Sequence, residues 1–353
     1  MSSGRMTRPL ATLVTVCLAT MSPAYALKYS PPQHHLAVDP SLASWQPGPL
    51  NVQPEEEFNL VGADIMDELT LGWVKLFRQA YPRLSVTMEA RSSGSGGAAI
   101  TEGRAHAAPV GRELLPAEEQ AFVAKFGYRP FAIRVATGSV SSLGKTAASV
   151  VLVSKDNPVV GLTMAQLDAI YSSTRKRGHA DIKTWGDVGL RDEWAKLPIH
   201  LYGLKPPNGI EQFFQMTVMQ GGTYKDGIQF VKGEGFTHAF TVASHDIGQH
   251  NRGGLTYALL ANVTPEVRVV PLAANAGEPF LAPTLENIAS HRYPLSRYVY
   301  IFVNRAPGKA LEPKTKEFLK LVLSREGQQI VAAEGVFIPL TPQTVREELA
   351  KLE

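Results

Sequence analysis

A segment rich in serine and glycine, at residues 91–100, carries the groups best suited to chemistry in this sequence. It reads Arg-Ser-Ser-Gly-Ser-Gly-Gly-Ala-Ala-Ile and follows an alternating apolar run at residues 84–88. Serine and glycine let the backbone turn tightly, so that consecutive N–H groups and a hydroxyl can converge at the positive end of a helix. Such a turn would hold a negatively charged group, and a plain helix cap on a flexible loop is the alternative.

Known nucleotide-binding motifs do not fit this segment. It contains no G-x-G-x-x-G pattern, and no lysine follows its glycines as in a P-loop. A second candidate, at residues 138–146, ends in Gly-Lys-Thr but has one residue too many between Gly138 and Gly144. A nucleotide site is therefore not expected.

Strand-to-helix units surround the segment and must position it. Residues 58–63 predict a strand, and apolar residues at helical spacing predict a helix over 64–81. A second strand is expected at 84–88 and a short third one within 105–112. Repeated units of this kind indicate an α/β sheet, in which ligands gather at the C-terminal ends of the strands. The loops expected to meet at one cleft are 62–65, 93–97 and 106–112.

We expect two lobes, one of them built from two separate stretches of chain. The first lobe is predicted at 58–154 plus 257–345, and the second at 155–256. With 353 residues, 44% of them hydrophobic and 19% charged, the chain can bury cores of this size. The second lobe repeats the strand, turn and helix plan around a turn at 203–209.

The first 26 residues have the order of a cleavable signal peptide. Arg5 and Arg8 precede an apolar run at 10–21, and Ala-Tyr-Ala follows at 24–26. The run is too short for a comfortable membrane span, so an exported and soluble mature chain is expected. The single cysteine, Cys17, follows a valine where lipoprotein processing usually needs a small residue, so lipidation is not expected. The mature chain would then have no disulfide and no thiolate metal site.

The balance of charge argues against a general nucleic-acid surface. Of the 35 lysines and arginines, Arg5 and Arg8 would leave with the signal peptide, so that 33 basic residues face 32 acidic ones. Binding to a phosphate backbone needs a clustered excess of cations, which this balance does not supply.

Residues 27–57, rich in proline, serine and glutamine, predict a mobile or loosely docked arm. The pair His34-His35 in this arm lacks a nearby carboxylate, and the histidines within 238–250 are not spaced for one metal-binding helix face. Ser-His-Asp at 244–246 cannot form a catalytic triad, because residues adjacent in sequence cannot make its line of hydrogen bonds. Neither a metal site nor catalysis is expected.

Several blocks, spread over residues 58–340, occur in an order typical of one family. They read Gly-Ala-Asp at 62–64, Ser-Gly-Ser-Gly-Gly at 93–97, Leu-Thr-Met-Ala-Gln-Leu-Asp-Ala-Ile-Tyr-Ser at 162–172, Thr-Trp-Gly at 184–186, Tyr-Pro-Leu-Ser-Arg-Tyr at 293–298 and Leu-Ser-Arg-Glu-Gly-Gln at 323–328. In these blocks the chain resembles the substrate-binding proteins of phosphate ABC transporters, the Pst family.

This resemblance implies a two-lobed periplasmic-binding-protein fold of type II (Venus flytrap), each lobe a mixed α/β sheet flanked by helices. The lobes would close on a small oxyanion such as phosphate in the periplasm and deliver it to an ABC transporter permease. A monomer without enzymatic activity, cofactor or metal is expected. The ligand positions carried over are Ala63, Asp64, Ser93, Ser95, Gly96, Gly97 and Arg112 in the first lobe, and Lys205, Asn208 and Gly209 in the second.

Polar groups of the family pattern are missing at four places. The family turn Arg-Asn-Ser-x-Ser-Gly-Thr is here Leu-Lys-Pro-Pro-Asn-Gly-Ile at 204–210. His106 and Gly111 replace an aspartate and a serine, and Ile65 stands where threonine is common. A buried phosphate oxygen without a donor would cost about 1–3 kcal/mol. Two hypotheses follow: a binding protein for phosphate or a related oxyanion, and a family member with a degenerate site that acts as a non-transport ligand-binding or protein-interaction protein.

Overall fold

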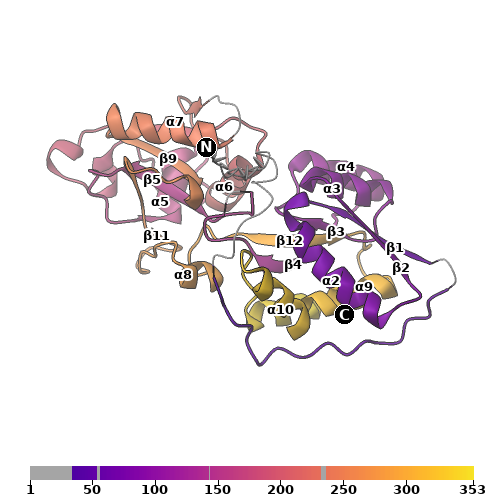
Figure 1. The fold of residues 1–353 in the computed structure, drawn as a ribbon. Helices are drawn as coiled ribbons and strands as arrows, with labels where there is room; N and C mark the ends of the chain where they lie inside the picture. Colours follow the sequence, from indigo (N-terminus) through magenta and orange to yellow (C-terminus); the bar gives the residue numbers. More distant parts are fainter. Residues whose placement is uncertain (1–33, 54–55, 143, 232–235) are drawn as a thin grey trace, which may run out of the picture.

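The chain folds into two lobes joined side by side (Figure 1). The computed structural model describes residues 34–53, 56–142, 144–231 and 236–353. The predicted signal peptide lies outside the described residues. Within the described ranges, no helix combines the length and the apolar content that a membrane crossing requires.

The first lobe has two small sheets. Strand β1 (Glu57–Gly62) pairs in parallel with β2 (Ser85–Ala90), and β12 (Tyr298–Val303) lies between β3 (Ala108–Val110) and β4 (Phe131–Thr137) in antiparallel pairing. A parallel bridge between Leu60 and Ala107 connects the two sheets. The helices of this lobe are η1 (Asp64–Met66), α2 (Asp67–Ala80), α3 (Ser93–Glu102), α4 (Pro116–Phe126), α9 (Pro313–Leu323), α10 (Arg325–Glu334) and α11 (Pro342–Lys351).

The second lobe is built on a mixed five-stranded sheet with the order β10-β5-β9-β7-β8. Its strands are β10 (Val267–Val269), β5 (Ser149–Ser154), β9 (Gly254–Leu259), β7 (His200–Leu204) and β8 (Gln229–Val231). Strand β7 runs parallel to β8 and β9, whereas β5 is antiparallel to β9 and β10. The other elements here are β6 (Leu162–Thr163), α5 (Met164–Tyr171), η2 (Trp185–Val188), η3 (Asp192–Trp194), α6 (Gly209–Met219), α7 (Phe236–Gln249), η4 (Leu260–Asn262), β11 (Leu272–Ala273) and α8 (Leu285–Ala289).

Each lobe has its own apolar core. All six residues of β5 are buried, as expected for a continuous apolar strand that is covered on both faces. The core around the five-stranded sheet runs along the chain from Ala147 to Leu295, and Ile338 joins it from the C-terminal part. The predicted lobe boundaries at 154 and 257 remain a prediction. Strand β5, which ends at residue 154, and strand β10, which follows residue 257, both pair within the five-stranded sheet of the second lobe.

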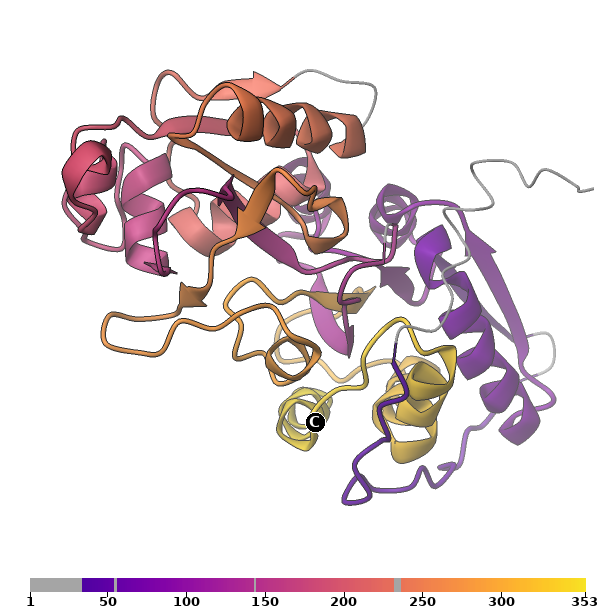
Figure 2. The same ribbon diagram turned by 60° about the vertical axis from the view of Figure 1, so that its left-hand side comes forward.

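The described part of the N-terminal arm, residues 34–53, is packed against the first lobe (Figure 2). Leu42 is buried in its core, and the Trp45 indole nitrogen donates to the Glu317 carboxylate at 2.9 Å. His34 is buried, and its Nε2 lies 3.1 Å from a backbone carbonyl oxygen. The prediction of a mobile or loosely docked arm is thus wrong for these residues, because their apolar anchors have no regular spacing that could reveal them.

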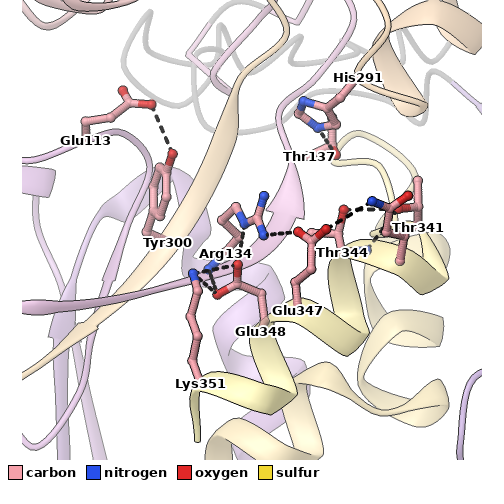
Figure 3. Close-up of polar contacts among 11 residues, drawn as sticks. Glu113, Arg134, Thr137, His291, Tyr300, Thr341, Thr344, Glu347, Glu348 and Lys351 are labelled. Atoms are coloured by element: carbon pink, nitrogen blue, oxygen red, sulfur yellow. Dashed lines mark hydrogen bonds and ion pairs between the residues drawn. The ribbon is translucent and has the colours of Figure 1, made fainter.

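A polar network attaches helix α11 to strand β4 (Figure 3). The Arg134 guanidinium donates from Nη2 to Glu347 at 2.7 Å and from Nε to the fully buried Glu348. The Lys351 ammonium lies 2.8 Å from both oxygens of Glu348. The network holds the C-terminal helix on the sheet whose central strand, β12, begins next to the cleft described below.

Candidate ligand-binding cleft

A pocket of about 250 Å³ lies between the two lobes. From the first lobe, the loops that follow β1, β2 and β3 all reach it, as the sequence predicted. From the second lobe, the start of α6 and the end of β9 reach it. Its lining residues are Ile65, Ser93, Gly111, Arg112, Gly144, Thr146, Asn208, Gly209, Ile210, Leu259 and Arg297.

Two helices begin at this pocket, one from each lobe. Helix α3 begins at Ser93, and the Ser92 hydroxyl caps it by accepting the Ser95 N–H at 3.2 Å. Helix α6 begins at Gly209, and the Asn208 side chain caps it by accepting the Ile210 N–H at 2.8 Å. Each helix N-terminus carries a partial positive charge of about half an elementary unit, so the pocket favours an anion.

Four predicted ligand residues line the pocket: Ser93, Arg112, Asn208 and Gly209. The other six lie outside its lining: Ala63, Asp64, Ser95, Gly96, Gly97 and Lys205.

Backbone and hydroxyl groups predicted to bind the ligand are already used within the first lobe. The Ala63 N–H donates to the Pro109 carbonyl oxygen at 2.8 Å, which joins β1 to β3. The Ser95 hydroxyl accepts the Ser92 N–H at 3.2 Å and lies 2.7 Å from the Ser92 carbonyl oxygen, which completes a capping box. Asp64 begins η1 and does not cap α2, whose N-cap is Met66.

The glycines of the segment serve close packing. A Cβ at Gly96 would lie 3.0 Å from Val110 Cγ2, and one at Gly97 would lie 3.3 Å from Leu114 Cδ2. Small residues are needed there because α3 packs tightly on β3. Lys205 is exposed at the turn after β7 and is not part of the pocket lining.

His106 is also directed into the first lobe. Its Nδ1 accepts the Asn59 N–H at 3.0 Å, and its ring packs on Phe58 with centroids 5.5 Å apart. Burial, followed by the nearby Lys314 ammonium, lowers the pKa of His106. His106 thus serves as a hydrogen-bond acceptor for a backbone N–H of β1.

Arg112, the cation predicted from the sequence, is neutralised inside the first lobe. Its Nη1 and Nη2 each donate to one oxygen of Glu118 at 2.8 Å. Glu118 is therefore the carboxylate partner of Arg112. Arg112 also crosses the cleft, because a Cβ at Gly209 would lie 2.9 Å from its Cδ.

Arg297 was missed from the sequence as a site residue. Its side chain is only 5% exposed, its Nη2 donates to Glu113 at 3.2 Å, and its guanidinium stacks over the Phe213 ring at 4.6 Å. Its Nε is buried and has no hydrogen-bond partner within the described residues. The one sequence signal for Arg297 is its position directly before an apolar strand, β12.

The loop at 138–146, the near match to a P-loop, forms the base of the pocket through Gly144 and Thr146. The Thr146 hydroxyl donates to the Gly111 carbonyl oxygen at 2.6 Å. The Lys145 ammonium lies 3.4 Å from Glu334. This lysine does not line the pocket.

The described residues contain no group of three or more His, Cys, Asp or Glu side chains placed to hold a metal ion. In α7 and the turn after it, the rings of His245 and His250 have centroids 5.9 Å apart. Asp246 accepts a hydrogen bond from the Tyr202 hydroxyl, which ties α7 to β7.

Comparison with known proteins gives one consistent result. The pattern of the PBP superfamily domain matches residues 53–326. The phosphate-binding protein PstS of Pseudomonas aeruginosa is 36% identical over 316 residues, which cover 89% of this chain and 91% of that protein. The protein of the same name from Staphylococcus aureus is 29% identical over 206 residues, or 58% of this chain and 57% of that one. The crystal structure of PstS from Borrelia burgdorferi has a similar fold, with a TM-score of 0.51, 16% identity and coverage of 81% of this chain and 100% of that chain.

Proposed function

This chain belongs to the PstS family of phosphate-binding proteins in the PBP superfamily, and from that premise we propose that it captures phosphate or a related small oxyanion between its lobes for an ABC importer. The resemblance noted in the sequence is thereby confirmed. The observation that carries the proposal is the meeting of two helix N-termini, those of α3 and α6, at one pocket between the lobes.

The groups of the pocket fit an oxyanion held by hydrogen-bond donors. Ser93 supplies a hydroxyl at the start of α3, and Arg297 supplies an unpaired Nε–H. The N–H groups of the first turns of the two helices add dipoles of the same sign. The lobes also touch directly, since the Gln212 side chain donates to the Leu114 carbonyl oxygen at 3.0 Å. Closure of these lobes would remove water from the ligand and so couple binding to delivery.

We propose that oxyanion capture takes place in the periplasm, after residues 1–26 have been removed. The protein would act there as a monomer that docks on a transporter permease. The named binding-protein relatives support a binding function rather than catalysis. The order of charged, apolar and small residues at the N-terminus supports export.

A second candidate is a family member whose cleft no longer serves transport. The observation that favours it is the loss of free charge and polar lining: Glu118 neutralises Arg112, and Ile65 and Ile210 line the pocket where polar groups are expected. Such a protein would keep the fold and use it to bind another ligand or a protein.

Titration calorimetry of the ligand-stripped protein with phosphate and with sulfate tests the proposal. We expect saturable heat that Arg297→Met weakens by roughly 10- to 100-fold, since a hydrogen bond to a charged group contributes about 1.5–3 kcal/mol. Lys205→Ala is the matched control, because it removes an exposed cation outside the pocket, and it should leave the affinity unchanged. Absence of heat with every oxyanion would select the second candidate.

A further inference from the structure

Three of the residues that line the cleft are apolar, and we call them the apolar wall. Ile65, Ile210 and Leu259 line the pocket from η1, α6 and the end of β9. Their side chains have no hydrogen-bonding atoms. An oxygen turned toward them would therefore lose its water without gaining a donor, whereas a carbon substituent would be well accommodated.

Within this wall, Ile65 is packed closely against Gly111. A Cβ at Gly111 would lie 2.2 Å from Ile65 Cδ1, so residue 111 must be small while isoleucine occupies position 65. The Thr146 hydroxyl holds the Gly111 carbonyl oxygen at 2.6 Å, which fixes the strand end beneath Ile65. The apolar residue and the glycine that makes room for it thus form a matched pair.

The other lining residues are polar or glycine, and one of their donors has no partner within the described residues. Ser93 lies at the N-terminus of α3, and Gly209 begins α6. The Arg297 side chain is 95% buried, by its 5% exposure, and its Nε has no partner within the described residues. A buried donor without a partner is unfavourable, so a ligand oxygen at this position would satisfy it.

The charges at the pocket cancel in pairs. Arg112 is paired with Glu118, and Arg297 lies 3.2 Å from Glu113. What remains are the two helix N-termini, with about half a unit of positive charge each. The sum is close to one charge, which matches a singly charged ligand better than a doubly charged one.

We propose that the cleft selects an oxyanion that carries one apolar substituent, as in an alkylphosphonate or alkylsulfonate, over inorganic phosphate. Three oxygens of the head face Ser93, Arg297 and the helix N-termini, and the substituent lies against Ile65 and Ile210. This inference rests on the proposed function, because it concerns the same cleft. The phosphonate and the sulfonate share the head and differ in charge.

Competition calorimetry with phosphate, sulfate, methylphosphonate and methanesulfonate tests the inference on the purified protein. At least one of the two organic anions is expected to bind ten-fold or more tightly than phosphate. Ile65→Thr should reduce this ratio about ten-fold or more, because it places a hydroxyl on the apolar wall. Ile65→Val is the matched control: valine has the shape of threonine, lacks the same Cδ1 and stays apolar, so the preference should persist.

The outcomes separate the inference from the function on which it rests. Phosphate binding that is as tight as that of both organic anions would overturn the inference and leave the proposed function standing. No binding of any of the four anions would overturn both. If Ile65→Thr fails to fold, as judged by its thermal transition, the ranking of the four anions on the unmodified protein still decides. A preference for methanesulfonate over methylphosphonate would identify the singly charged ligand.

Discussion

Arg134 in strand β4 and Arg297 just before strand β12 are two arginines of the first lobe, the first partly buried and the second buried, and they differ in how completely they are paired. Both stack on an aromatic ring, Arg134 over Tyr298 at 4.9 Å and Arg297 over Phe213 at 4.6 Å. Arg134 donates to two carboxylates, as Figure 3 shows. Arg297 reaches one carboxylate only, that of Glu113, and its Nε stays unpaired within the described residues.

The difference separates a structural arginine from one that is free to bind. A saturated guanidinium in the interior contributes to stability only through its partners, and its removal leaves their charge buried. An unsaturated guanidinium at a pocket can still form a strong bond to a ligand. The Tyr300 hydroxyl donates to the other oxygen of the Glu113 carboxylate at 3.2 Å (Figure 3).

The comparison predicts that Arg134→Met is the more damaging of two matched substitutions. It leaves the fully buried Glu348 with Lys351 as its remaining cation, and we expect a loss of about 3 kcal/mol in the free energy of unfolding. Urea denaturation followed by circular dichroism measures this loss.

Arg297→Met is the partner experiment. Its carboxylate, Glu113, is 38% exposed and can be rehydrated, so the stability should change by less than about 1 kcal/mol while oxyanion binding weakens. Equal destabilisation by the two substitutions would show that Arg297 is as structural as Arg134.

The pH dependence of stability extends the comparison to the surroundings of Arg134, where His291 lies. His291 packs on the Tyr298 ring with centroids 3.7 Å apart, and its Nε2 lies 2.7 Å from the Thr137 hydroxyl. Burial, followed by the Arg134 cation, lowers the pKa of His291 to about 4. The unfolded state, with a pKa near 6.5, therefore binds the proton more readily than the folded state. Stability is fully present above pH 6.5 and falls as the pH drops toward 4, by about 3 kcal/mol from this residue.

Thermal unfolding of the native protein and of His291→Asn between pH 7 and pH 4 isolates this contribution. Asparagine tolerates the positive φ of 54° at this position and does not titrate. The slope of stability against pH should be shallower in the variant, even though other buried groups such as His34 and His106 titrate in both proteins. Parallel slopes would mean that the pKa of His291 is the same in the folded and unfolded states.

Local sequence patterns made the strands and helices of the first lobe predictable. Site residues that depend on contacts between distant parts of the chain could not be predicted from such patterns. The serine- and glycine-rich segment revealed α3 because its turn and cap residues are neighbours in sequence. Arg297 could not be recognised, because its pairing with Glu113 and its stacking on Phe213 join parts of the chain that are distant in sequence. Lys205 was misleading for the opposite reason: it stands at the family position but is exposed to solvent.

The same distinction between paired and free groups predicts opposite roles for two neighbouring serines. The Ser95 hydroxyl completes the capping box of α3, so Ser95→Ala should cost about 1 kcal/mol of stability and leave oxyanion affinity nearly unchanged. Ser93 lines the pocket, and its hydroxyl makes no hydrogen bond within the described part of the chain. Ser93→Ala should therefore weaken binding several-fold with little effect on stability, because only the ligand uses its hydroxyl. Denaturation and calorimetry on both variants check this, and weaker binding in Ser95→Ala alone would return the ligand role to Ser95 and place the oxyanion deeper along α3 than the pocket lining indicates.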